Sequence, residues 1–104
     1  MTDPRDRLAE MDGWKLKSGR WYHPVWHKLG SGQKRHPHPP TLDGAAAAMP
    51  EGWWFTCEAD YWIAHSPVSD MSFILTIPIL RTKDETRDRY ALALAVREYM
   101  ESKR

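Results

Sequence analysis

The most regular hydrophobic pattern of the chain lies near its C-terminus, where apolar residues recur at helical spacing. The pattern predicts a helix that begins at Thr82 or Asp84 and continues to about Ser102. Acidic residues stand near the start of this segment and basic residues near its end, an order that suits the helix dipole. The apolar stripe expected to face the core consists of Leu92, Ala93, Val96, Tyr99 and Met100.

Two shorter helices are predicted nearer the N-terminus. Residues 3–12 begin with an Asp-Pro pair that suits a helix start, and Gly13 is a natural stop. Residues 42–49 follow Thr41, which can cap a helix, and stop before Pro50. The small alanine side chains of this second helix would allow close packing on a sheet.

Two short alternating runs around the Ser-Gly pair at residues 18–19 predict a β-hairpin. With a two-residue turn, Leu16 lies opposite Trp21 and Trp14 lies opposite His23, on the face that we expect to be core. The other face is expected to meet solvent or a ligand, and it carries Lys15, Lys17, Arg20 and Tyr22.

Three further segments have the composition and alternation of strands, and they cover residues 52–59, 61–65 and 71–80. Pro78 lacks a main-chain donor, so the last of them is predicted to be an edge strand or to end early. Trp53 and Trp54 are adjacent and therefore point to opposite faces of their strand. We interpret both as core residues, which requires helices on both faces of the sheet. If helices cover only one face, one of the two is exposed and can anchor a partner.

Together these patterns predict an α+β fold, with a small, mainly antiparallel sheet, helices packed on it in layers, and a long C-terminal helix. The length of 104 residues fits a single domain over 1–104. The single cysteine, Cys57, excludes an intrachain disulfide, and the polar N-terminus has no apolar signal core. No apolar run is long enough to cross a bilayer. These features favour a cytoplasmic location and no membrane partner.

Charge changes this picture more than composition does. The net charge is +1, but no acidic residue stands between Asp12 and Asp43, where lysines, arginines and histidines gather. This asymmetry indicates an anionic partner, either an acidic protein or an anionic ligand, and leaves nucleic acid as a less favoured possibility. The predicted contact surface consists of Lys15, Lys17, Arg20, Tyr22, Trp26, Lys34 and Arg35. The alternative is that Trp14 and Trp21 belong to the core and the lysines only solubilise the chain.

Candidate catalytic and metal-binding residues are weaker. His23, His27, His36 and His38 invite a metal interpretation, but no carboxylate accompanies them in their stretch, and we predict solvated loop histidines and no metal or cofactor. Cys57 with His65 could imitate a nucleophile and base, but a place on the same strand face as Trp53 and Phe55 predicts a buried, inert thiol. Glu58 and Asp60 are interpreted as solvent-facing residues near a turn. We therefore predict that the chain is not an enzyme.

Three segments resemble small phage proteins of the phage ABA sandwich type. They are residues 8–14 (Leu-Ala-Glu-Met-Asp-Gly-Trp), residues 41–53, and the helical run at residues 91–96. The resemblance implies a small sheet with helices packed on it and a phage or prophage origin, and it implies no shared chemistry. The basic, His- and Pro-rich stretch before Thr41 departs from the pattern and directs attention to residues 20–40.

Three functions remain open from the sequence. The leading prediction is a phage-encoded, non-catalytic accessory protein that binds and modulates a host factor, with inhibition of a bacterial defence system as the expected setting. The second is a protein that binds or sequesters a small, nucleotide-type ligand. The third is a structural or assembly protein that acts by self-association through its tryptophans.

Overall fold

The computed structural model describes residues 3–23, 35–67 and 75–103, and in this part of the chain three helices accompany two antiparallel sheets. The elements follow the order α1 (Pro4–Met11), β1 (Lys15–Lys17), β2 (Arg20–Tyr22), α2 (Leu42–Ala48), β3 (Trp54–Cys57), β4 (Tyr61–His65), β5 (Thr76–Leu80) and α3 (Glu85–Ser102). The predicted α+β class, with a long C-terminal helix, is confirmed.

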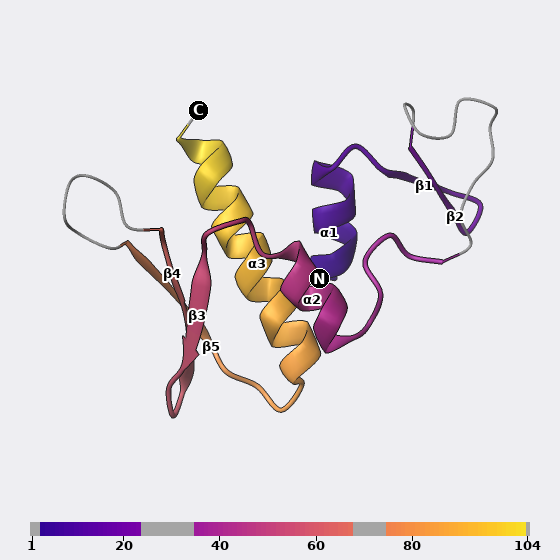
Figure 1. Cartoon of the computed structure of the whole chain (residues 1–104). Coiled ribbons are helices and arrows are strands. Elements are labelled where there is room, and N and C mark those ends of the chain that lie inside the picture. Colours follow the sequence, from indigo (N-terminus) through magenta and orange to yellow (C-terminus); the bar gives the residue numbers. More distant parts are fainter. Residues whose placement is uncertain (1–2, 24–34, 68–74, 104) are drawn as a thin grey trace.

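The helix α3 forms the middle layer of the fold (Figure 1). One side of it packs against β4 and β5, where Leu92 and Val96 meet Trp62 and Ala64. Its other side packs against α1 and α2. There the buried residues are Leu8, Ala45, Ala48, Tyr90 and Ala93. The alanines of α2 therefore pack against a helix, and not against the sheet as predicted.

The helix α3 begins at the predicted cap. The Asp84 carboxylate accepts a hydrogen bond from the main-chain N–H of Arg87 at 3.0 Å, which satisfies one of the free donors of the first turn. Most of the predicted apolar stripe is buried or half-buried. Met100 is 42% exposed, because it borders a shallow surface hollow and not the packed core.

The helix α3 is tied to the sheet by Asp88, which is only 4% exposed. Its carboxylate accepts a hydrogen bond from the indole N–H of Trp62 in β4 at 3.1 Å. It also accepts hydrogen bonds from the main-chain N–H of Thr82 at 2.7 Å and from the Thr82 hydroxyl at 2.6 Å. One buried carboxylate thus joins α3, β4 and the connection that leads from β5.

The three-stranded sheet has the order β3-β4-β5, so β3 and β5 are its edges. Pro78 lies in β5, as predicted for an edge strand. The pairing of β4 places Trp62 and Ala64 on the face that packs on α3. The opposite, outer face carries no charged side chain, and its residues are Trp54, Thr56, Tyr61, Ile63, His65, Thr76, Pro78 and Leu80.

The described helices lie on one side of this sheet only (Figure 1). Trp54 on the outer face is 46% exposed, and its ring stacks on His65 with centroids 3.9 Å apart. Trp53 on the inner side is half-buried against Tyr99. The interpretation of both tryptophans as core is therefore wrong for Trp54, because no described helix covers the outer face.

The hairpin of β1 and β2 has the predicted register, with Leu16 opposite Trp21. Ser18 and Gly19 both have positive φ angles, 51° and 77°, as a two-residue turn of the type that matches strand twist requires. Trp21 is buried, but Leu16 is 55% exposed. The inner face of the hairpin is thus only partly core, because its packing partners gather around the tryptophans and leave Leu16 uncovered.

No helix in the described ranges is both long enough and apolar enough to cross a membrane.

Candidate functional site

The predicted basic surface is present on the hairpin in part. Lys15 pairs with Tyr22 and Lys17 pairs with Arg20, so these four side chains share one face of the ribbon. The three cations are exposed and Tyr22 is half-buried. Arg35 is exposed outside the hairpin, while Trp26 and Lys34 lie outside the described residues.

The tryptophans of the hairpin do not contribute to this surface. Trp14 and Trp21 are 6% and 5% exposed and cluster with Ala9 of α1. This packing agrees with the alternative interpretation of the two indoles as core. On the described basic face, Tyr22 is therefore the aromatic ring left to stack on a ligand.

The two histidines after the basic surface, His36 and His38, lie beside Asp6 of α1 and Asp12, the residue that follows α1. The sequence does not indicate these contacts, because the partners are far apart along the chain. His36 Nδ1 accepts the main-chain N–H of His38 at 2.9 Å, so its Nε2 carries the proton and donates to Asp6 at 2.6 Å. Both ring nitrogens of His36 are occupied. A general base needs a free nitrogen, so this Asp–His pair is structural.

His38 lies between α1 and α3. Its Nε2 is buried without a hydrogen bond and stands 3.6 Å from Oδ2 of Asp12. The other oxygen of this carboxylate, Oδ1, accepts a hydrogen bond from Arg97 at 2.8 Å. Burial lowers the pKa of His38 below its ordinary value of 6.5, and His36 and Arg97 act in the same direction, while Asp12 opposes them. His38 is therefore neutral in the fold at neutral pH.

The lowered pKa of His38 predicts acid sensitivity. Because the unfolded chain binds a proton at this site more readily than the folded one, the free energy of unfolding should fall as the pH drops below 6.5. A His38→Gln variant should lose this part of the pH dependence. Urea unfolding of both proteins between pH 5 and pH 8 measures it; parallel curves over that whole range would contradict the assignment.

The described histidines do not assemble a metal site. Within residues 3–23, 35–67 and 75–103, no group of three or more His, Cys, Asp or Glu side chains is placed to hold a metal ion. His23 contacts the main-chain carbonyl of Asp12 at 3.0 Å through its ring, and His36 is bound to Asp6. His27 lies outside the described residues.

Cys57 differs from its prediction, because it is exposed and not a buried thiol. It lies at the end of β3. The helix α3 packs against β4 and β5 and leaves the inner face of β3 less covered. His65 lies at the opposite end of the pairing, opposite Trp54, and its ring contacts the Thr56 hydroxyl at 2.9 Å. Cys57 and His65 therefore form no nucleophile–base pair. Glu58 and Asp60 are exposed at the β3–β4 turn, as predicted.

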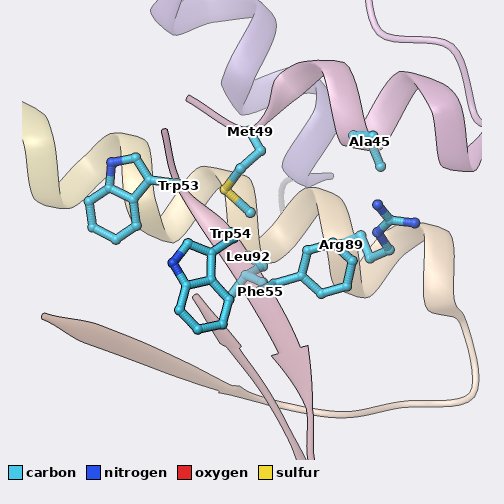
Figure 2. Close-up of a pocket in the computed structure, with 8 residues that line it drawn as sticks. Ala45, Met49, Trp53, Trp54, Phe55, Arg89 and Leu92 are labelled. Carbon is cyan, nitrogen blue, oxygen red and sulfur yellow. The ribbon is translucent and has the colours of Figure 1, made fainter. Parts of the chain in front are cut away.

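A concave site lies between α2, β3 and α3 (Figure 2). It is an open hollow of about 260 Å³. Seven of its eight lining residues are apolar, and the lining consists of Ala45, Ala46, Met49, Trp53, Trp54, Phe55, Arg89 and Leu92. Arg89 is the single charged residue of this lining.

The hollow exists because the helices do not extend fully under β3. The helix α3 packs against β4 and β5, and α2 ends at Ala48, before the chain turns into the sheet. A turn closed by the hydrogen bond from the Trp53 N–H to the Pro50 carbonyl at 3.2 Å then delivers the aromatic run into β3. Phe55 points to the inner face and is nevertheless 37% exposed.

Arg89 reaches into this hollow from α3 (Figure 2). Its guanidinium lies 4.6 Å from the ring centroid of Phe55, in a cation–π contact that orients the group. Among the described residues, no carboxylate lies within ion-pair distance of Arg89. The donors of its planar group are thus available to a ligand.

The strand β3 also presents its main chain along the hollow. The Glu58 N–H donates to the Tyr61 carbonyl at 2.8 Å, and this bonding direction alternates along an antiparallel strand. Thr56 and Trp54 therefore bond to β4, while the N–H and C=O groups of Phe55 and Cys57 point to the free edge. No described strand pairs with that edge.

The sequence prediction missed this site. A run of three aromatic residues at 53–55 has to place rings on both faces of a strand, and this was a usable signal. Arg89 gave none, because an arginine three residues before Leu92 in a helix is common on a solvated face. Only the tertiary arrangement brings it beside Phe55.

Comparisons of the chain with protein-family models, with curated proteins and with solved structures found no match in any of the three.

Proposed function

We propose that this chain is a non-catalytic binding protein that captures an extended segment of a partner protein at the free edge of β3. The observation that carries the proposal is the apolar hollow beside that edge, with Trp54 and Phe55 exposed at its border. Unpaired strand edges bind extended peptides through main-chain hydrogen bonds, and neighbouring pockets select the side chains. Tryptophan is a frequent energetic centre of protein interfaces.

The size of the hollow favours a partner protein over a small ligand. Cavities that enclose drug-sized molecules measure about 300–1,000 Å³. A hollow of about 260 Å³ that is open to solvent suits one or two side chains of a docked segment, and a nucleotide-type ligand would extend beyond it.

The biological setting stays as the sequence suggests it. We propose a phage-encoded accessory protein that binds and modulates a host factor, with a bacterial defence component as the expected target. The support is the small size of the chain and the resemblance of its residues 8–14, 41–53 and 91–96 to small phage proteins.

A second candidate, self-association, is favoured by the outer face of the sheet. Trp54, Tyr61 and Leu80 are 46%, 45% and 68% exposed on this uncharged surface. Two copies could cover it without opposing like charges. The two candidates differ in their product, a heteromeric complex or a concentration-dependent dimer.

Cross-linking from Cys57 tests the proposal, because this exposed cysteine accepts a photoreactive label on β3, the strand that carries Trp54 and Phe55. Three variants accompany the wild type in an extract of bacterial cells. Ala46→Trp fills the hollow from an exposed position of α2. Ala47→Trp is the matched control, since Ala47 is exposed on the same helix outside the hollow lining. The double variant Lys15→Glu, Arg20→Glu removes the predicted basic surface.

We expect one cross-linked bacterial protein with the wild type, the Ala47→Trp control and the hairpin double variant. Ala46→Trp should reduce its yield at least about tenfold, because a filled pocket excludes the anchoring side chain. Loss of the product with the hairpin variant alone would place the site on the basic surface instead. A product made only of this chain would favour self-association.

A further inference from the structure

We infer that the segment bound at β3 carries an acidic residue and, two positions away from it, a large apolar residue. The carboxylate of the acidic residue binds Arg89, and the apolar side chain enters the hollow. This inference rests on the proposed function and specifies the partner sequence. It assigns two subsites with different chemistry on one strand edge. The apolar subsite is formed by Met49, Phe55 and Leu92, and the anion subsite is Arg89.

The assignment of an anion follows from the state of Arg89. Arg89 is half-buried, and its guanidinium carbon lies over the ring of Phe55, 4.6 Å from the centroid. No carboxylate in the described part of the chain lies within ion-pair distance of it. A cation–π contact uses none of the N–H donors of an arginine, so these donors stay free for a carboxylate. Phosphate is the other anion that this geometry accepts.

The spacing follows from the geometry of the strand edge. The outward N–H and C=O groups of Phe55 define the position where an added strand would pair. A residue paired with Phe55 places its side chain on the same face as Phe55, which is the face of the hollow. Residues two positions away in the partner share that face. An acidic residue there lies within reach of Arg89, whereas the residue between them points to the outer face.

The residue two positions from the acidic residue should have a large, apolar side chain. The subsite for it is lined by a methionine, a leucine and the aromatic border of β3, and it offers no polar partner apart from Arg89. Burial of an aromatic or a branched aliphatic group in such a lining is favourable, while a buried polar group would lack hydrogen bonds. The expected pattern is therefore a large apolar residue, any residue, and Asp or Glu, in either chain direction.

Selection of a display library of short random linear peptides against the full chain tests this pattern. The wild type should enrich peptides with an acidic residue two positions from a large apolar residue. Arg89→Glu should reverse the charge preference and enrich Lys or Arg at that position. Arg87→Glu is the matched control, because Arg87 is exposed on the same helix outside the hollow lining and should leave the wild-type pattern unchanged.

Affinity for the best wild-type peptide gives the second readout. Replacement of its acidic residue by the corresponding amide should weaken binding roughly tenfold, as loss of one charge-assisted contact does. The same replacement should have little effect on binding to Arg89→Gln, because the two changes remove one shared contact.

Three results would overturn the inference, and they differ in what else they overturn. In the first, the selected peptides bind the wild type and lose affinity for Ala46→Trp, but they show no preference for an acidic residue. This result leaves the edge site in place and removes the role of Arg89. In the second, a phosphopeptide of the same sequence, or free phosphate, binds in place of the carboxylate peptide. This result assigns the subsite to phosphate. A library without any enriched peptide overturns both the inference and the proposed function.

Discussion

Replacement of Asp88 by alanine is expected to lower the free energy of unfolding by about 3 kcal/mol, a large share of the stability of a chain of this size. The buried indole N–H of Trp62 would lose its acceptor, and no water reaches it easily because Trp62 is only 4% exposed. The two hydrogen bonds from Thr82 would be lost as well, at a lower cost, because Thr82 is exposed and water can replace them.

Urea unfolding followed by tryptophan fluorescence measures this loss. The matched control is Asp84→Ala, which removes an exposed helix cap on the same helix and should cost about 1 kcal/mol. If Asp88→Ala costs no more than the cap variant, then the carboxylate does not hold α3 to the sheet. In that case the position of Arg89, one residue further along α3, would lose its explanation.

Replacement of Gly44 by alanine is the second large effect, and its sign is informative. Helix propensity alone predicts a gain of about 1 kcal/mol, because Gly44 lies inside α2. The structure predicts a loss of about 1–3 kcal/mol instead, as overpacking does. An added Cβ would stand 2.7 Å from the main-chain oxygen of Pro39 and closer still to the Tyr90 hydroxyl, which donates a hydrogen bond to that oxygen.

Thermal unfolding of Gly44→Ala beside Ala47→Gly separates the two effects. Ala47 is exposed on the same helix, so its replacement by glycine reports helix propensity alone and should cost about 1 kcal/mol. A stabilised Gly44→Ala protein would mean that the contact between α2, Pro39 and Tyr90 is looser than described. The wall of the hollow formed by α2 would then be free to shift.

The elements of the fold were largely predictable because their signals are local. Asp84 as a cap, the Ser-Gly turn with positive φ angles and the proline in an edge strand each act through their own backbone. The arrangement of the helices and the sheet in layers was harder to predict, because it depends on which faces of these elements pack against each other. The sequence pattern of Trp53 and Trp54 specified opposite faces, but it could not show that helices cover only one of them.

The candidate site was harder to predict for the same reason. The prediction placed four hairpin residues on one face, and the register of the two strands agrees with it. A two-residue turn fixes this register, and the residues are Lys15, Lys17, Arg20 and Tyr22. Arg89 and Phe55 are 34 residues apart in sequence and meet only because α3 crosses the sheet beside β3. The exposure of Cys57 has the same origin, since α3 covers β4 and β5 and leaves the end of β3 open.

Amide hydrogen exchange of the full chain, with and without a peptide selected on it, tests the central claim most directly. If the bound segment adds to the free edge of β3, then the N–H groups of Phe55 and Cys57 should exchange markedly more slowly in the complex, while those of the β1–β2 hairpin should not change. Slower exchange across the hairpin, with Phe55 and Cys57 unaffected, would contradict the account and return the binding site to the basic surface.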